Sequence, residues 1–462
     1  MSEKLTMKGK LGYASAAVGD AACYMFVNTF LLFFLTTVAG IEPAAAGTIT
    51  VIGAFWNALV NPIIGYMSDN SATKWGRRRP FIIIMAIPLA ASTFMLFTAM
   101  DMIPLIKPLY YGAMTMIFWT AYTGFFVPYL ALGAEYTTDY DERIELRSYA
   151  SVFNIVGTLF GMVLPSIFAD VLQQHGFTLS GAWSMTGAVV GIFSMVSLLI
   201  TGWAAKGKDL DCRQEGRGAL PHMNLKEIFG EYLQVLKLKP VQYLLFSALF
   251  ALICNTMMSS DLMYFFTYNQ GLTAVETSLM FLFRSMASII VIMIVKKICA
   301  GRDKRSSLMG VYTVGGIALI VNKFISPDNM IELSIFVVLA VIAVTIYWQF
   351  MPAIVYDVCE YDELETGKQR QGAIVSLLSL VEAFAAGLGS QLLGIILQIA
   401  GFNGEAAVQS ETAMLWIENC LTIVPVIFIA LALLSLKKYP ITKEKFAEIQ
   451  RQLAERKAQE NK

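Results

Sequence analysis

A series of twelve long apolar segments, separated by short polar turns, most constrains what this chain can fold into. A helix that crosses a bilayer needs about 20 mostly apolar residues, and a backbone surrounded by lipid must satisfy its own hydrogen bonds. The segments do not alternate in polarity as the strands of a membrane barrel would. We therefore predict an all-α polytopic membrane protein with twelve transmembrane helices, over 12–39, 46–68, 81–100, 107–133, 151–173, 183–204, 239–267, 274–297, 308–325, 332–356, 372–401 and 412–436.

The composition agrees with a membrane protein and excludes several other classes. Charged residues make up 15% of the chain, against about 25% in a soluble domain, and the mean hydropathy is +0.61. The net charge of zero suggests no nucleic-acid partner. The six cysteines, at positions 23, 212, 254, 299, 359 and 420, have no paired spacing, and there are two histidines. We therefore predict no disulfide framework, no metal site and no cofactor.

The positive charges predict the orientation in the membrane. If the helix ends alternate between two sides, all but three of the 34 Lys and Arg lie on the side that holds both termini. The three exceptions are Lys107, Lys323 and the intramembrane Arg284. Because positive charge accumulates on the cytoplasmic side, we predict a multi-pass protein of the cell (inner or plasma) membrane, in contact with lipid, with both termini in the cytoplasm.

The longest polar interruption divides the apolar segments into six and six. We predict an N-terminal six-helix bundle over 1–204, a cytoplasmic linker over 205–238, a C-terminal six-helix bundle over 239–436 and a cytoplasmic tail over 437–462. The second part of the linker, NLKEIFGEYLQVLKL, has helical spacing and is predicted to lie along the inner membrane surface. Basic turns occupy matching places in the two halves, GYMSDNSATKWGRRRP and KKICAGRDKRSS. Such paired halves are typical of transporters built from structural repeats.

The first of these basic turns carries a resemblance to a known superfamily. Gly65 and Asp69, followed by Gly76, Arg77 and Arg78, resemble the turn between helices 2 and 3 of the major facilitator superfamily. A glycine permits close helix contact, and Asp69 can pair with a nearby arginine. The resemblance implies a cytoplasmic gate at Gly65, Asp69, Arg77 and Arg78. The alternative is that the arginine-rich turn serves topology alone.

Three longer stretches narrow the resemblance to one family. NPIIGYMSDNSATKWGRRRPFI, VPYLALGAEYTTDYDERIELRSY and YDVCEYDELETGKQRQG are similar to the regions after helices 2, 4 and 10 of the glycoside–pentoside–hexuronide:cation symporters, the melibiose-carrier family. The early Gly19-Asp20 pair is also similar. The resemblance covers nearly the whole chain, in order. It implies the major facilitator fold and a carrier that moves a sugar or glycoside with H⁺, Na⁺ or Li⁺.

The chain departs from that family at the cation site. Where the family has two aspartates on helix 2, this chain has Asn57 and Asn61. The spacing of four places both amides on one helix face, but an amide carries no charge and exchanges no proton near neutral pH. The alternative is that the amides only bond between helices. The family's charged positions on helices 4, 5 and 11 are also replaced, at Phe126, Ala150 or Ser151, and Ala383.

A different set of charges lies within the predicted helices. Ionisable groups at bilayer depth cost several kcal/mol, so they usually pair or face a cavity. Asp20 and Glu382 are candidate coupling carboxylates. Arg284 could pair with Glu382, with an anionic group on the substrate, or in a plain structural salt bridge. Asp261 and Glu418 complete the set.

Aromatic side chains near these charges are candidates for binding a sugar, because an aromatic face can lie under the apolar side of the ring. Trp119 and Tyr122, three residues apart, form the strongest pair. With them we predict a substrate site of Asp20, Tyr24, Trp119, Tyr122, Arg284 and Trp348. The alternative for each aromatic residue is helix packing.

These observations predict a transporter that imports a sugar by alternating access, coupled to a cation, with H⁺ favoured over Na⁺. The predicted partners are the small-molecule sugar and membrane lipid, and the carrier is predicted to be a monomer. A cation-independent uniporter or exchanger is the alternative within transport. A polytopic membrane enzyme or a sensor is the alternative from another class, but two histidines in polar segments offer no convergent catalytic cluster.

Overall fold

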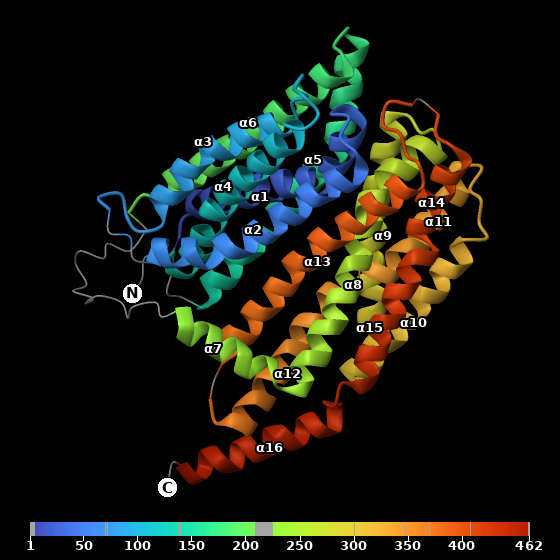
Figure 1. The fold of residues 1–462 in the computed structure, drawn as a ribbon. Helices are drawn as coiled ribbons and strands as arrows, with labels where there is room; N and C mark the ends of the chain where they lie inside the picture. The colour runs from blue at the N-terminus through green and yellow to red at the C-terminus, as the bar shows by residue number, and fades with distance from the viewer. Residues whose placement is uncertain are drawn as a thin grey trace. The chain divides into compact units, whose positions relative to one another are not determined.

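The computed structural model describes residues 5–460 apart from 70, 72, 137–139, 208–224, 300, 346, 369 and 407. All named elements within these residues are helices (Figure 1). Those of the first half are α1 (Met7–Phe33), the π-helical η1 (Phe34–Val38), α2 (Pro43–Asp69), α3 (Arg79–Leu96), α4 (Lys107–Glu135), α5 (Tyr140–Gln174) and α6 (Leu179–Ala204).

The second half begins with the short helix α7 (Leu225–Leu236), which forms within the predicted linker. The remaining linker residues 208–224 lie outside the described residues. The other elements are α8 (Lys239–Tyr264), η2 (Phe265–Asn269), α9 (Ala274–Cys299), α10 (Lys304–Asn322), α11 (Met330–Val344), α12 (Tyr347–Thr366), α13 (Gln371–Ile399), α14 (Glu411–Leu421), α15 (Ile423–Lys438) and α16 (Lys443–Glu460).

Eleven helical segments among the described residues are long and apolar enough to cross a membrane. Four of them join consecutive elements: α1 with η1, α8 with η2, α11 with α12, and α14 with α15. The predicted segment 308–325 corresponds to α10, which has 19 residues but begins with Lys304, Arg305 and two serines. This polar first turn lowers its average apolarity. With α10 included, the described helices match the predicted twelve spans.

The predicted cytoplasmic turn over 357–371 is mostly helical, which corrects the boundary. The helix α12 continues to Thr366. It ends where Gly367 adopts a positive φ of 69°, a left-handed conformation that a glycine at a helix C-terminus adopts without strain. The Gly367 amide donates to the Glu363 carbonyl, at 2.9 Å. Apolar patterning locates the lipid-embedded part of this helix but not its extension beyond that part.

The chain forms two compact units. The first unit contains 1–223 together with 266–282 and 394–410, and the second contains 224–265, 283–393 and 411–462. In the first unit α1 packs against α5 and α6, α2 against α4, and α3 against α4 and α6. In the second unit α8 packs against α14 and α15, and α10 packs against α11 and α15.

Helix α1 is the most buried membrane span of the first unit, and small residues allow its close approach to α5. A methyl group added at Gly157 would overlap the Val18 carbonyl, and one added at Gly161 would overlap the Ala22 carbonyl. The two glycines stand four residues apart, as in the small-xxx-small pattern that lets membrane helices approach closely. They therefore fix the rotation of α1 at the level of Asp20.

Hydroxyl groups of α6 hold the opposite side of α1. Ser194 Oγ donates to the Gly19 carbonyl at 2.9 Å, and Ser197 Oγ donates to the Ser15 carbonyl at 2.6 Å. One turn further along, Thr201 Oγ1 donates to the Gly12 carbonyl at 2.7 Å. Hydrogen bonds of this kind between membrane helices contribute about 0.6 to 2 kcal/mol each.

The tail helix α16 packs against α12 in the second unit (Figure 1). The Lys443 amide donates to Asp303 Oδ1 at 2.8 Å, and the Lys304 ammonium lies 5.1 Å from the centre of the Phe446 ring. Ile449 and Leu453 are buried. The tail is therefore an ordered part of the second unit.

The contact between α5 and α1 gives a prediction for stability. Gly161→Ala should destabilise the protein by about 1 to 3 kcal/mol, because the new methyl group meets backbone atoms that cannot move aside. The measurement is the thermal unfolding temperature of the purified protein in detergent. The control is Gly112→Ala, in a helix where nothing lies within 4 Å of the added Cβ. Equal unfolding temperatures for the two variants would contradict the proposed contact.

Candidate functional site

The most distinctive polar contact of the first unit joins α1 to α4. The Tyr122 hydroxyl donates to Asp20 Oδ1 at 2.7 Å, and both side chains are buried. No lysine or arginine pairs with Asp20 within the described part of the chain. An intramembrane carboxylate whose partner is a neutral phenol is suited to binding a proton or a cation, because no fixed positive charge compensates it.

Aromatic rings surround this contact. Tyr122 lies 5.4 Å from Trp119, 5.6 Å from Tyr24 and 5.5 Å from Phe126, measured between ring centres. Tyr24 and Trp119 meet edge to face at 6.0 Å. The structure thus brings together four residues that the sequence proposed for one site, Asp20, Tyr24, Trp119 and Tyr122. Phe126, which replaces the family's acid on helix 4, stacks on Tyr122.

The two amides of α2 form part of a hydrogen-bond network with α4. Thr123 Oγ1 donates to Asn57 Oδ1 at 2.5 Å. Asn61 Nδ2 donates to the same oxygen at 3.2 Å and to the Asn57 carbonyl at 3.1 Å. Next to them, Trp56 Nε1 donates to Thr120 Oγ1 at 2.8 Å. Asn57 Oδ1 already accepts two hydrogen bonds, which fits the interhelical role better than a role as a cation ligand.

In the second unit the two predicted charges do not pair with each other. Arg284 on α9 donates to Ser259 Oγ of α8 at 2.9 Å. Glu382 on α13 accepts from the Tyr347 hydroxyl of α12 at 2.9 Å. The alternative of an Arg284–Glu382 ion pair is therefore wrong for this conformation. Trp348 is 56% exposed and lies edge to face against Tyr347 at 5.1 Å.

The predicted gate residues lie in the turn between α2 and α3. Arg78 Nη1 lies 2.5 Å from Asp69 Oδ1 and 2.7 Å from Ser68 Oγ, which fastens the end of α2. Gly76 adopts a φ of 104° in this turn, where Arg77 also lies. The sequence interpretation of Gly65 as a close-contact residue finds no support, since an added Cβ there would meet Val127 at an ordinary 3.8 Å.

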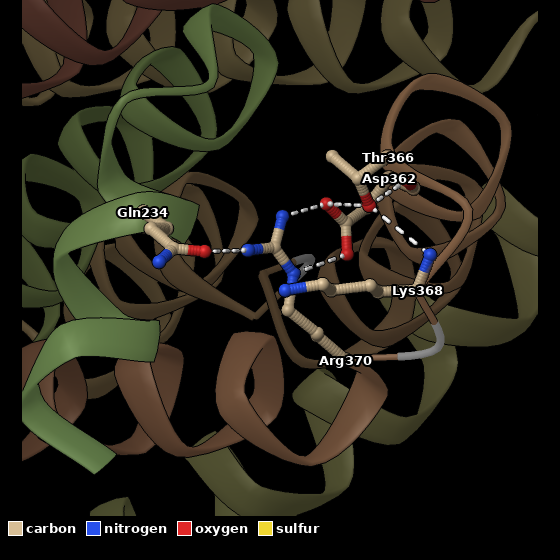
Figure 2. Close-up of polar contacts among 5 residues, drawn as sticks. All are labelled: Gln234, Asp362, Thr366, Lys368 and Arg370. Atoms are coloured by element: carbon tan, nitrogen blue, oxygen red, sulfur yellow. Dashed lines mark hydrogen bonds and ion pairs between the residues drawn. The ribbon is translucent and has the colours of Figure 1, made fainter. Parts of the chain in front are cut away.

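A buried ion pair holds one end of the second unit, and Figure 2 shows it. Arg370 forms a two-pronged ion pair with Asp362, through Nε at 3.0 Å and through Nη2. Its Nη1 donates to Gln234 Oε1 of α7 at 3.1 Å. Lys304 of α10 binds Asp357 of α12, at 2.6 and 2.9 Å to the two carboxylate oxygens. These bonds tie α7, α10 and α12 to the start of α13.

Sequence reasoning identified the charged and amide residues but missed the residues that form hydrogen bonds with them. Tyr347, Ser259 and Thr123 were not singled out, because a tyrosine, a serine and a threonine in apolar helices are common. The acidic motif EYDE over 360–363 contains Asp362, which pairs with Arg370 of the same predicted turn, 357–371, and not with a residue of another turn. The motif DYDER over 139–143 lies partly outside the described residues, but its Glu142 accepts from the Leu5 amide at 2.8 Å.

Comparison with known proteins places this fold and site among membrane transporters. A family model described as MFS/sugar transport protein matches residues 12–443. The uncharacterized symporter YnaJ of Bacillus subtilis is 26% identical over 98% of this chain and 96% of its own. The glucuronide carrier protein homolog of Escherichia coli is 24% identical over 97% and 96%, respectively. The solved nucleoside transporter NupG shares the fold, with a TM-score of 0.69 at 13% identity, over 94% and 100% of the two chains.

The protein is therefore a multi-pass membrane transporter of the major facilitator type, and not an enzyme. More specifically, the chain belongs to the MFS/sugar transport protein family, because the family model covers almost its whole length. This confirms the resemblance that the sequence motifs indicated, and with it the predicted all-helical fold.

The buried pair at Arg370 gives a second prediction. Arg370→Met should destabilise the second unit by about 3 to 5 kcal/mol, because it leaves Asp362 buried without its countercharge. The side chains of Arg370 and Asp362 are 6% and 0% exposed. Thermal unfolding in detergent measures the effect.

Arg451→Met is the matched control, because its ion pair with Glu455 is exposed at 75% and 62% and should contribute about 0 to 1 kcal/mol. Adding Asp362→Asn to Arg370→Met should restore part of the lost stability. A loss no larger than that of the Arg451 variant would contradict the assignment.

Proposed function

We propose that this protein carries a sugar or glycoside across the membrane together with a cation, and that the cation is H⁺ rather than Na⁺. The observation that carries the proposal is the buried Asp20 carboxylate, which accepts a hydrogen bond from the Tyr122 hydroxyl and lies among aromatic rings. Aromatic rings can stack on the apolar face of a sugar, and the carboxylate can accept hydrogen bonds from the sugar hydroxyls or bind a proton.

The amide network of α2 supports H⁺ over Na⁺. A sodium site would need several free oxygen ligands and gains most from negative charge. Asn57 Oδ1 accepts from Thr123 and Asn61, and neither amide carries a charge. Proton coupling needs only one carboxylate that changes its protonation state. Asp20 and Glu382 are the two carboxylates that we propose for this role.

The relatives' names support the substrate class. One relative is named a glucuronide carrier protein homolog and another a symporter. A glucuronide carries a carboxylate, and Arg284, whose guanidinium bonds to the neutral Ser259, could pair with such a group. We therefore propose that Arg284 and Trp348 contribute to binding, and that acidic sugars should be tested beside neutral ones.

The direction of transport and the orientation of the protein in the membrane are part of the same proposal. The distribution of Lys and Arg supports cytoplasmic termini, and import from outside follows the resemblance to the sugar symporters. We further propose that the carrier acts as a monomer. The cation-independent uniporter or exchanger is a second candidate, which the neutral pair Asn57 and Asn61 favours.

Alternating access requires that contacts at one end of the carrier form and break. The first compact unit also includes two segments from the second half of the sequence, 266–282 and 394–410. Ser278 Oγ donates to the Val163 carbonyl at 2.7 Å, and the Ala44 amide donates to Gln398 Oε1 at 2.9 Å. A methyl group added at Gly394 would overlap the Pro43 carbonyl. We propose that these contacts open during transport.

The first test of the function is a thermal-shift screen of the purified protein against neutral and acidic sugars, with and without Na⁺. Uptake of the best ligand into proteoliposomes is then measured with and without a protonophore. Proton coupling predicts that the protonophore abolishes accumulation against a gradient. Unchanged accumulation would reject H⁺ as the driving ion.

Asp20→Asn gives a third prediction. The variant keeps an acceptor for Tyr122 but cannot exchange a proton, so accumulation should stop at the external concentration while exchange of sugar across the membrane continues. The control is Asp101→Asn, at an exposed position between α3 and α4. Accumulation by Asp20→Asn that a protonophore still abolishes would exclude Asp20 as the coupling group.

Gly394→Ala gives a fourth prediction. The added methyl group should disfavour the closed contact with Pro43 by about 1 to 3 kcal/mol, which is roughly 5- to 150-fold in that equilibrium. Uptake should fall accordingly while sugar binding in the thermal-shift assay persists. Gly372→Ala, on the same helix with open space around it, should leave uptake unchanged. Normal uptake by Gly394→Ala would show that this contact is not part of the cycle.

A further inference from the structure

Asp261, on α8, differs from every other acidic side chain considered above. It is 0% exposed, and neither carboxylate oxygen has a hydrogen-bond partner within the described residues. Burying an isolated carboxylate in its charged form is very costly, so such a group becomes neutral by taking up a proton.

Asp261 belongs to a polar stripe on one face of α8. Ser247, Cys254 and Asp261 repeat every seven residues, which is about two turns of helix and keeps them on the same side. All three are fully buried, and the Ser247 hydroxyl also has no hydrogen-bond partner among the described residues. Buried polar groups are usually satisfied in native proteins, so this stripe requires an explanation beyond packing.

Two tyrosines of the same unit do not connect Asp261 to Glu382. The Tyr312 side chain of α10 is 1% exposed and lacks a hydrogen-bond partner within the described residues. Tyr347 donates to Glu382 at 2.9 Å, and Glu382 is less buried than Asp261. Since neither Asp261 oxygen has a hydrogen-bond partner either, no chain of hydrogen bonds joins the two carboxylates among the described residues.

The ionisable groups of the neighbouring helices leave Asp261 without a countercharge. From α14, Cys420 interacts electrostatically with Asp261, whereas Glu418 is paired with Lys323 at 2.7 Å. From α11, Glu332 accepts from Asn329 Nδ2 at 2.8 Å.

The remaining neighbours of α8 supply no ion-pair partner to Asp261 within the described residues. Arg284 of α9 donates to Ser259, two residues before Asp261 on α8, at 2.9 Å, whereas neither Asp261 oxygen has a hydrogen-bond partner. From α15, Lys437 and Lys438 lie in the last turn, beside Arg305, which donates to the Lys437 carbonyl at 2.6 Å. From α12, Tyr347 is bonded to Glu382 and Asp357 to Lys304. The α7 side chains described, including Gln234, carry no charge near Asp261 that the structure records.

We propose that Asp261 is a proton-binding residue, protonated in this conformation, that releases its proton in another conformation of the transport cycle. The proposal rests on the proposed proton-coupled function for its role in the cycle, but the protonated state stands on burial and geometry alone. Only a proton moves in this step: it leaves the Asp261 carboxylic acid and passes to water. The ligand of the site is H⁺.

The protonated state is tested by infrared spectroscopy of the purified protein at neutral pH, without any sugar. The carbonyl stretch of a protonated carboxylic acid should be present in wild-type protein, should shift when aspartate is labelled with ¹³C, and should lose intensity in Asp261→Asn. Asp170→Asn, at the edge of α5, is the control and should leave the band unchanged. Because every aspartate carries the ¹³C label, the same measurement on Asp20→Asn shows whether the band comes from Asp20, and this comparison keeps the test available if Asp261→Asn does not fold.

The release of the Asp261 proton during transport is tested in proteoliposomes with the sugar found by the thermal-shift screen. Asp261→Asn should lose accumulation against a gradient while sugar counterflow continues. The protonated state is overturned if wild-type protein has no aspartate-derived acid band. It is also overturned if that band is lost in Asp20→Asn and unchanged in Asp261→Asn. If the band is lost in Asp261→Asn but accumulation is unchanged, the proposed role of Asp261 in transport is overturned. If no sugar is transported at all, the proposed function fails while the infrared result still decides the site.

Discussion

The close packing of α1 against its neighbours is the contact on which the first unit depends. Gly157 and Gly161 let the α5 backbone reach the Val18 and Ala22 carbonyls, and hydroxyls of α6 bond to α1 from the other side. In a lipid environment helices gain little from the hydrophobic effect, so small residues and interhelical hydrogen bonds supply the association energy. Held in this way, α1 directs Asp20 toward Tyr122 of α4.

The same principle orders the second unit, with charged groups in a larger role. Arg370, Asp362 and Gln234 join three helical segments through one guanidinium, and Lys304 joins α10 to α12. These pairs lie near helix ends, whereas Asp261 and Glu382 lie within the spans without a cationic partner that the structure records. Paired charges hold the helices together, and we propose that the two carboxylates without an ion-pair partner change protonation during transport.

Much of this protein could be predicted from the sequence because lipid leaves few choices. The length of each apolar segment, the need for internal hydrogen bonds and the distribution of Lys and Arg fixed the number of spans and the class of fold. The motifs around Asp69, Glu135 and Asp362 indicated the family, which the family model confirms. Trp119, Tyr122, Tyr24 and Asp20 could be nominated for one site because sugars bind to aromatic and acidic groups.

Tertiary structure decided which side chain meets which. Sequence patterning allowed Arg284 to pair with Glu382, but the two bond to Ser259 and Tyr347 instead, because partner choice depends on helix rotation and depth. Similarly, the pattern could not tell whether Asn57 and Asn61 form a cation site, and their bonds to Thr123 and to each other came from the packing of α2 on α4. Hydrophobic periodicity specifies that a helix lies in lipid; the fit of small residues between helices specifies its rotation, and the rotation specifies the site.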